Sequence, residues 1–301
     1  MPSDIKTNHW LFVITPKKWH DYILLMRLDR PIGTWLLLIP CLWGLAIYHQ
    51  QLSYQDWLRY VGIFALGAFV LRSAGCVWND ILDREFDKKV VRTKNRPLAS
   101  GRVGVDDALK LLAVLLAIGL VMLFLLGNHP AQVVALLSLG LVVPYPLMKR
   151  IFPLPQLWLG FTFNIGILVA GMLTTNDYFN IGLWWLYIIG VLWTLAYDTI
   201  YALQDKDEDA LLGLKSSALL FGKHIKTAIG VFYLSMAGLL LGLIYYLGDG
   251  NRFAYVYWLL AGFAMFDSYD KVHLKQPYRN LRVFRRQWLV GLFIFLALYY
   301  R

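Results

Sequence analysis

The strongest constraint on this sequence is a series of long apolar runs that carry no charged residue. Each run reaches or approaches the roughly 17–25 residues that a helix needs to cross a bilayer. Six such runs are present: Pro31–Gln55, Leu111–Gly127, Ala131–Met148, Ile151–Asn176, Tyr178–Tyr197 and Ala228–Gly248. Three further runs are shorter or, in one case, interrupted by Arg72: about Trp57–Trp78, Phe253–Phe266 and Gln287–Tyr300. The pattern predicts an all-α integral membrane protein with nine transmembrane helices in one bundle.

The composition supports a membrane environment. Hydrophobic residues make up 58% of the chain and charged residues 16%, against roughly 45–50% and about 25% in soluble domains. The excess apolar surface therefore requires lipid to cover it. Residues 1–30 mix polar and aromatic side chains without the apolar core of a cleavable signal. We therefore expect these residues to form a cytosolic segment before the first span. The whole chain, residues 1–301, is expected to form a single membrane domain.

The basic residues predict an orientation. Of the 29 Lys and Arg residues, 25 fall in the N-terminal segment and in the loops after the second, fourth, sixth and eighth predicted helices. Loops rich in Lys and Arg stay in the cytoplasm. We therefore expect the N-terminus in the cytoplasm and the C-terminus in the periplasm of a bacterial inner membrane. The formal charge of +10 does not indicate nucleic-acid binding, because these residues lie in short loops beside anionic lipid headgroups.

The acidic residues are concentrated where this orientation places the cytoplasm. Nine of the 19 lie in Asn79–Asp87 and Asp198–Asp209, at the start of two predicted loops, 79–110 and 198–226. At about 100° per residue, each stretch extends the preceding helix with a carboxylate stripe. The first stripe holds Asn79, Asp83 and Asp87 with Asp80 adjacent, and the second holds Asp198, Asp205 and Asp209.

Stacked carboxylates repel one another, so two such stripes indicate a compensating cation. Mg²⁺ fits, because it takes oxygen ligands from one or two carboxylates together with substrate phosphates. A basic segment follows each stripe, Lys94–Gly101 after the first and Leu214–Gly222 after the second. The two halves therefore form a weak internal repeat, which predicts half-bundles that face a central cavity. Ordinary polar helix ends are the alternative.

Charged residues inside predicted spans are functional candidates by default. Arg72 lies two turns before Asn79, and Asp198 lies two turns before Asp205. A structural Arg72–Asp198 pair is the alternative. The segment Tyr145–Arg150 ends the fourth predicted span with two cations, which membrane-anchoring side chains would also explain.

These features together indicate a polyprenyl diphosphate site. Mg²⁺ and a basic surround would neutralise the diphosphate and make it a better leaving group. A long isoprenoid tail gains about 0.8 kcal/mol per CH₂ buried in the bilayer, so an enzyme that uses it benefits from being in the membrane.

Five segments of this chain resemble the UbiA-type intramembrane prenyltransferases. Two are the acidic motifs Asn79-Asp80-x-x-Asp83-x-x-x-Asp87 and Asp205-x-x-x-Asp209. The other three are similar to the members that prenylate 4-hydroxybenzoate: Met26–Thr34, Arg72–Asp80, and Tyr145–Arg150 with Leu154-Pro155-Gln156. The resemblance covers the first six predicted spans and the loop to Gly222.

The resemblance implies Mg²⁺-dependent transfer of a polyprenyl group from polyprenyl diphosphate to 4-hydroxybenzoate in ubiquinone synthesis. The new bond forms at the ring carbon ortho to the hydroxyl, and pyrophosphate is released. The implied ligands of the metal and diphosphate are Asn79, Asp80, Asp83, Asp87, Asp205 and Asp209. The implied basic contacts to phosphate are Arg72, Lys94 and Lys215, while Arg150 would hold the acceptor carboxylate. Asp198 would orient or deprotonate the phenol, which makes Asp198, Asp83 and Asp205 the candidate catalytic residues.

Three alternatives share part of this pattern. A related prenyltransferase with a haem, naphthoate or lipid-alcohol acceptor would carry the same acidic motifs. CDP-alcohol phosphotransferases also use membrane aspartates and Mg²⁺, but the Asp-Gly and Ala-Arg pairs expected in one motif are missing. A cation transporter would place acids at the bilayer midplane. The segment Asp267–Arg286 matches no motif of the family and is expected to be a cytosolic loop.

Overall fold

The computed structural model describes residues 9–248, 251–274 and 276–301, and within these ranges the regular structure is entirely helical. The chain divides into two compact units, which are described separately. The first unit contains the chain up to Trp35 together with Ala65–Leu125, and the second contains Leu36–Phe64 together with Leu126–Arg301.

The first unit is built on two long helices, of which the first also reaches into the second unit. Its helices are α1 Leu11–Ile14, η1 Lys17–Trp19, α2 His20–Leu25, the first turn of α3 Ile32–Ala46, most of α4 Tyr54–Asp87, and α5 Val105–Leu125. Its core is formed by Leu25 from α2, Val77 and Ile81 from α4, Leu98 from the following loop, and Leu115 from α5. The loop after α4 therefore packs back onto the helix that carries the first acidic stretch.

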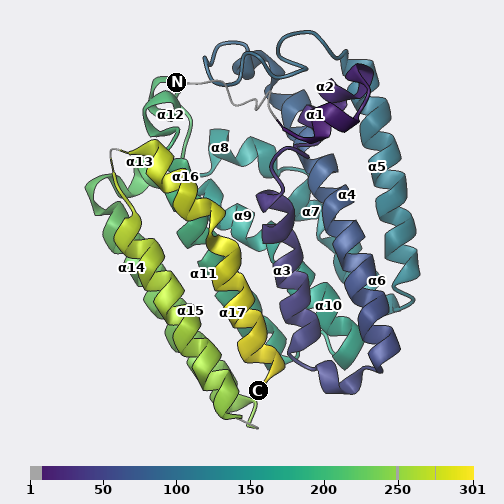
Figure 1. The fold of residues 1–301 in the computed structure, drawn as a ribbon, viewed down its shortest axis with the longest axis vertical. Helices are drawn as coiled ribbons and strands as arrows, with labels where there is room; N and C mark the ends of the chain where they lie inside the picture. The colour runs from purple at the N-terminus through teal and green to yellow at the C-terminus, as the bar shows by residue number, and fades with distance from the viewer. Residues whose placement is uncertain (1–8, 249–250, 275) are drawn as a thin grey trace. The chain divides into compact units, whose positions relative to one another are not determined.

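The second unit holds the remaining helices. They are η2 His49–Gln51, α6 His129–Leu137, α7 Leu139–Val142, η3 Tyr145–Leu147, α8 Met148–Ile151, α9 Pro155–Phe163, α10 Ile165–Thr175, α11 Ile181–Ala202, α12 Lys206–Leu211, α13 Ser217–Phe221, η4 Gly222–His224, α14 Ile225–Tyr246, α15 Arg252–Lys271, α16 Pro277–Arg285 and α17 Gln287–Tyr299. Helix α11 is central, because it packs against α9, α10, α14 and α16. Helix α15 lies between α14 and α17 (Figure 1).

Close approach of small residues holds the centre of the second unit together. A Cβ added to Gly44 of α3 would lie 2.4 Å from the Ile167 carbonyl oxygen of α10. The buried indole of Trp43 packs on that of Trp193, and its Nε1 donates a 2.9 Å hydrogen bond to the Gly291 carbonyl. Small residues allow helix backbones to come this close where there is no hydrophobic driving force between helices in lipid.

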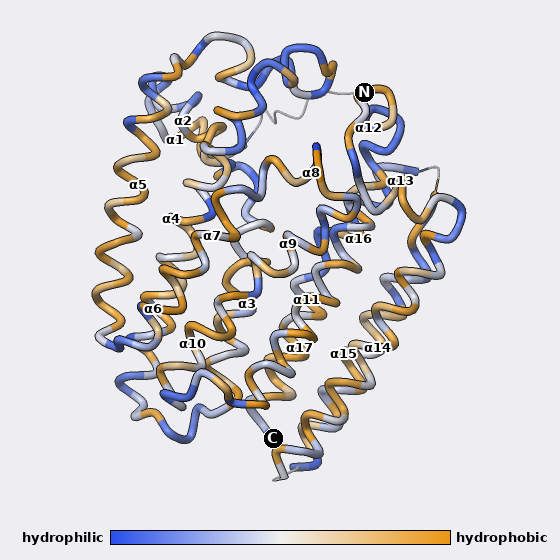
Figure 2. Tube along the Cα trace, turned by 180° about the vertical axis from the view of Figure 1, so that it is seen from behind, coloured by the Kyte–Doolittle hydropathy of each residue, from blue (hydrophilic) through white to orange (hydrophobic). Residues whose placement is uncertain are grey.

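Six helical segments are long and apolar enough to cross a membrane, by length and composition. They are Tyr54–Asp87, Val105–Leu125, His129–Ile151, Pro155–Thr175, Ile181–Ala202 and Ser217–Tyr246. Figure 2 shows apolar residues along the length of α5, α14 and α15 and polar residues toward their ends. The other three predicted spans coincide with α3, α15 and α17, which are not among these six. All-helical membrane architecture is therefore confirmed, and the count of nine spans stays a prediction.

Three details of the predicted elements are wrong. The run Pro31–Gln55 is not one helix, because α3 ends at Ala46 and the chain then turns through η2. The second acidic stripe does not continue α11: the Gln204 and Asp205 amides bond to the carbonyls of Tyr201 and Ala202, which closes the helix with a tight turn.

The third correction concerns Asp267–Arg286, which was expected to be a loop. Its first five residues complete α15, and Pro277–Arg285 forms α16. Proline at the first position of α16 loses no hydrogen bond, because the first amides of a helix have no intrahelical acceptor.

The substitution Gly44→Ala tests the close contact between α3 and α10. The added methyl group would meet backbone rather than a movable side chain, so we expect a loss of about 1–3 kcal/mol of stability. Gly62→Ala in α4 is the matched control, because nothing lies within 4 Å of its added Cβ. Unfolding in mixed detergent–SDS micelles would measure both. Equal stability of the two variants would contradict the packing described here.

Candidate functional site

The first acidic stretch forms the last turns of α4 and faces inward within its unit. Asp80 and Asp83 are each 1% exposed as residues, and Asp87 is 8% exposed. The amide of Asn79 donates a 3.1 Å hydrogen bond from Nδ2 to Oδ2 of Asp83, one turn later. Helical continuation of this stretch, as predicted, therefore brings four oxygen-bearing side chains together on successive turns.

Arg27 holds Asp80 through both carboxylate oxygens. Its Nη2 lies 2.8 Å from Oδ1 and 2.9 Å from Oδ2 of Asp80, while its Nη1 donates to the Leu24 carbonyl at 3.0 Å. The backbone of Arg27 has a φ of 59°, in the left-handed region that residues other than glycine rarely adopt. The chain therefore accepts local strain at the residue that neutralises Asp80.

Arg96 bridges two of the buried carboxylates. Its Nη1 lies 3.3 Å from Oδ1 of Asp80 and 2.9 Å from Oδ2 of Asp87, two turns apart on α4. The loop that carries Arg96 is fixed near its start, where Thr93 donates from Oγ1 to the Asp87 carbonyl at 3.0 Å. The side chain of Lys94, a predicted phosphate contact, is exposed on the same loop.

Arg72 lies deeper in α4, and its side chain lies against the first turn of α3. A Cβ added to Gly33 would lie 2.4 Å from Nε of Arg72. The glycine therefore leaves room for the guanidinium against the backbone. This contact joins two of the segments that resemble the prenyltransferases, Met26–Thr34 and Arg72–Asp80.

The second acidic stretch is arranged differently within the second unit. Asp198 is partly buried in α11, Asp205 occupies the N-cap position of α12, and Asp209 lies in α12. The Asp209 amide donates a 2.7 Å hydrogen bond to the Asp205 carbonyl. The three carboxylates therefore come from two helices and the turn that joins them.

The segment that carries Arg150 is fastened to the loop after the second acidic stretch. The Lys215 amide donates to the Lys149 carbonyl at 2.8 Å, and its Nζ donates to the Ile151 carbonyl at 2.8 Å. The buried Gln156 accepts a 2.8 Å hydrogen bond from the Ser217 amide. The ammonium of Lys215, a predicted phosphate contact, is thus used to join these two segments.

The residues fit a hard metal ion by their donor chemistry. Asn79, Asp80, Asp83 and Asp87 present carboxylate and amide oxygens, the ligands that Mg²⁺ prefers. Within the described ranges no three Asp, Glu, His or Cys side chains converge as a metal cage, since Arg27 and Arg96 engage Asp80 and Asp87. Mg²⁺ requires only one or two carboxylates when substrate phosphates complete its coordination.

Sequence reasoning missed Arg27 and Arg96 as partners of the acidic motif. Both stand in segments that were singled out, Met26–Thr34 and Lys94–Gly101. Eight Lys and Arg residues follow Asp83 before α5 ends, and only the path of the loop decides which of them turns back to α4.

The fold and these segments define a class, namely an all-helical membrane protein with buried aspartates and arginines at the end of a long helix. The model of the UbiA prenyltransferase family matches residues 37–297. This chain therefore belongs to the UbiA prenyltransferase family.

Two named relatives are similar along much of the chain. A 4-hydroxybenzoate octaprenyltransferase of Vibrio parahaemolyticus is 39% identical over 95% of this chain and 98% of its own length. The mitochondrial 4-hydroxybenzoate polyprenyltransferase of Rattus norvegicus is 45% identical over 75% of this chain. The chain spans between 49% and 60% of the length of the mitochondrial relatives it matches.

Solved structures share the fold. The apo structure of a UbiA homolog from Aeropyrum pernix has a TM-score of 0.74 and 26% identity, covering 87% of this chain and 94% of that one. The UbiA homolog of Archaeoglobus fulgidus bound to GPP and Mg²⁺ has a TM-score of 0.65 and 17% identity, covering 92% and 98%.

Arg96→Gln tests the bridge between Asp80 and Asp87. Removing the cation leaves buried carboxylates without that partner, so we expect a loss of about 3–5 kcal/mol in the free energy of unfolding. Arg102→Gln is the control, because its ion pair with Asp21 is on the surface and contributes roughly 0–1 kcal/mol. SDS titration in mixed micelles would compare them. The bridge is refuted if adding Asp87→Asn to Arg96→Gln restores none of the stability.

Proposed function

We propose that this protein transfers a polyprenyl group from polyprenyl diphosphate to the ring carbon ortho to the hydroxyl of 4-hydroxybenzoate. The products are 3-polyprenyl-4-hydroxybenzoate and pyrophosphate, in the synthesis of ubiquinone. The observation that carries the proposal is the set of buried aspartates on successive turns at the end of α4, held by two arginines. The names of the relatives support the choice of donor and acceptor.

The donor diphosphate would bind at the acidic motifs. Asn79, Asp80, Asp83 and Asp87 of the first motif, and Asp205 and Asp209 of the second, would be the Mg²⁺ ligands. When bound, the metal would neutralise the diphosphate and make it a better leaving group. Arg72, Lys94 and Lys215 would contact phosphate oxygens as diphosphate departs. For Lys215 this requires exchange of its present bond to the Ile151 carbonyl.

Arg27 and Arg96 have a positioning role in this proposal. They hold Asp80 and Asp87 in fixed rotamers with their oxygens turned inward. They also reduce the repulsion among carboxylates before a metal arrives. Fixed charges of this kind stabilise a transition state without reorganising during the reaction.

The acceptor would bind beside the segment Tyr145–Arg150. Arg150 would pair with the carboxylate of 4-hydroxybenzoate, and Asp198 would orient the phenol hydroxyl or accept its proton. The ring carbon would form a C–C bond to the prenyl carbon as the C–O bond to diphosphate breaks. The ring then loses the proton at that carbon and regains its aromaticity.

The proposal also covers the number of membrane spans and the orientation of the chain in the membrane. The nine spans would form one catalytic membrane domain over residues 1–301. The N-terminus and both acidic motifs would lie in the cytoplasm of a bacterial inner membrane, and the C-terminus in the periplasm. The asymmetry of Lys and Arg between loops supports this orientation.

Asp83→Asn tests the donor site. Replacing a carboxylate that carries metal and diphosphate should lower the rate of prenyl transfer about 10²–10³-fold. The assay would give purified membranes 4-hydroxybenzoate and a polyprenyl diphosphate, with Mg²⁺ or with EDTA. Glu85→Gln, an exposed residue in the same turn that pairs with Lys88, should retain full activity.

Three results of that assay would contradict the proposal. They are the absence of any prenylated 4-hydroxybenzoate, activity that EDTA leaves unchanged, and full activity in both Asp83→Asn and Asp205→Asn. Prenylation of a naphthoate, haem or lipid alcohol in place of 4-hydroxybenzoate would identify a different acceptor.

Arg150→Gln tests the acceptor site separately. A hydrogen bond to a charged group contributes about 1.5–3 kcal/mol, so the KM for 4-hydroxybenzoate should rise about 10- to 100-fold. The KM for the polyprenyl diphosphate should stay within about twofold. Lys149→Gln, at the neighbouring cation, is the control. An equal rise in both KM values would show that Arg150 does not recognise the acceptor.

A further inference from the structure

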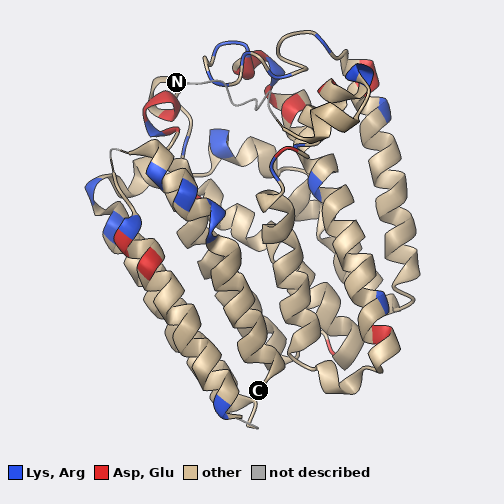
Figure 3. Ribbon diagram, viewed as in Figure 1, with Lys and Arg blue, Asp and Glu red and all other residues tan. Residues whose placement is uncertain are grey.

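A basic cleft lies between the end of α15 and α16, outside the residues assigned to prenyl transfer. Its volume is about 510 Å³. It is lined by Asp267, Ser268, Lys271, Gln276, Arg279, Arg282, Val283 and Arg286. Lys and Arg residues gather on α16 and on the adjoining end of α15 (Figure 3). Both helices belong to the second unit, so the cleft is complete within it.

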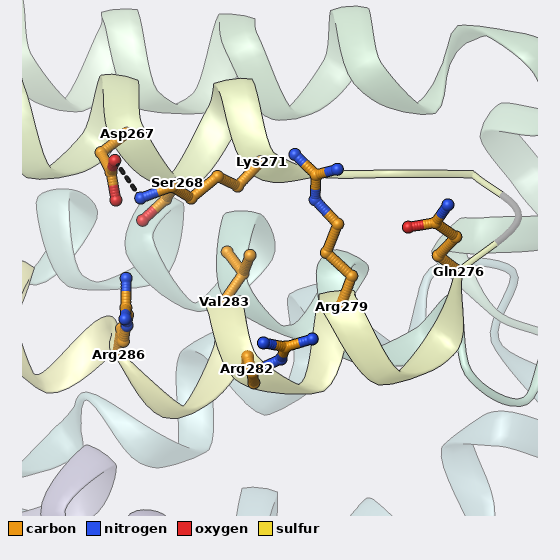
Figure 4. Close-up of a pocket in the computed structure, with 8 residues that line it drawn as sticks. All are labelled: Asp267, Ser268, Lys271, Gln276, Arg279, Arg282, Val283 and Arg286. Carbon is orange, nitrogen blue, oxygen red and sulfur yellow. Dashed lines mark hydrogen bonds and ion pairs between the residues drawn. The ribbon is translucent and has the colours of Figure 1, made fainter.

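The cleft carries a net positive charge. Among the described residues that line it, Asp267 is the one acidic residue, and its Oδ1 pairs with Nζ of Lys271. Figure 4 shows this pair on α15, with the side chains of Arg279 and Arg286 rising toward it from α16. In the described parts of the chain, no ion pair or side-chain hydrogen bond neutralises the guanidinium groups of Arg279, Arg282 and Arg286. Their spacing of three and four residues places them along one face of α16.

A buried polar network fixes α16 beside α15. Asn280 is 1% exposed, and its side chain accepts from the His273 amide at 3.0 Å and donates to the His273 carbonyl at 2.7 Å. Gln287 is fully buried, donates to Ser268 Oγ at 3.1 Å and accepts from the Tyr233 hydroxyl at 3.1 Å. The arginines are therefore presented from a fixed helix, although holding like charges together is unfavourable.

An exposed apolar stripe leads into the cleft along α15. Leu260 and Phe263 precede Asp267 by seven and four residues, so they share its face, and they are 39% and 69% exposed. A ligand with an anionic head and an apolar tail could place its head among the arginines and its tail along this stripe.

From these features we infer that the α15–α16 cleft is a binding site for a phosphate group, carried by an anionic lipid headgroup or by free phosphate. Guanidinium groups bind phosphate oxygens through paired hydrogen bonds. The exposed amide of Gln276 adds a polar group to the lining. Bound phosphate would offset part of the positive charge of the three arginines and link α15 to α16. The inference is independent of the proposed prenyl transfer, which uses none of these residues.

The test is a titration of the full-length protein in dodecyl maltoside with EDTA present, which suppresses metal-dependent diphosphate binding elsewhere. One arm adds dioctanoyl phosphatidylglycerol, a second adds zwitterionic dioctanoyl phosphatidylcholine, and a third adds inorganic phosphate. Each is added to the unmodified protein, to Arg279→Gln/Arg282→Gln, and to Arg285→Gln. Arg285 is the matched control, because it is exposed on α16 but does not line the cleft.

We expect the anionic ligand to bind at least about tenfold more weakly to the double variant and unchanged to Arg285→Gln. Asp267→Asn should strengthen binding, because it removes the one negative charge and releases Lys271. A loss confined to the phosphatidylglycerol arm assigns the site to lipid, and a loss in the inorganic phosphate arm assigns it to free phosphate. Absence of binding in both arms, or equal binding by all variants, would overturn the inference. The unfolding temperature of the double variant without ligand confirms that it is folded.

Discussion

The first half of the site depends on the burial of charged carboxylates at the end of α4. Removing a carboxylate from water costs several kcal/mol unless close partners offset the loss. Arg27 and Arg96 supply that offset, and each requires an unusual path of the chain. Arg27 needs left-handed backbone before α3, and Arg96 needs the loop after α4 to fold back on the helix. The core contacts of Leu98 and the strained residue are therefore consequences of the same electrostatic requirement.

The two acidic stretches of the chain lie in different local structures. Helix α4 continues through its acidic stretch, while α11 ends at Ala202 and the chain turns before α12. In the second half, Lys215 and Gln156 join the segment that carries Arg150 to the loop after the acidic stretch. The two acidic stretches therefore differ in local structure, because acidic residues are compatible with both a helix end and a turn.

Much of the helical architecture could be predicted from the sequence, because long apolar runs have few stable alternatives in a membrane. The predicted elements are wrong where local hydrogen bonds determine whether a helix continues or ends. One example is the end of α11, where the Gln204 and Asp205 amides bond to the carbonyls of Tyr201 and Ala202. The pairing of Arg27 with Asp80 joins residues 53 positions apart. Residue type can predict that a buried aspartate needs a cation, but the choice among many cations requires the fold.

The segment Asp267–Arg286 shows how one set of residues can satisfy two constraints. The basic residues of this segment add to the excess of Lys and Arg in the predicted cytoplasmic loops, and this excess predicts the orientation. An orientation signal requires only their number and leaves their spacing free. Their placement at intervals of three and four residues on α16, beside a helix end fixed by Asn280 and Gln287, goes beyond that requirement. A scattered set of cations would lie apart in water, whereas these three line one cleft. An anion between them would offset the cost of holding like charges together, which is the physical basis for assigning a ligand to this cleft.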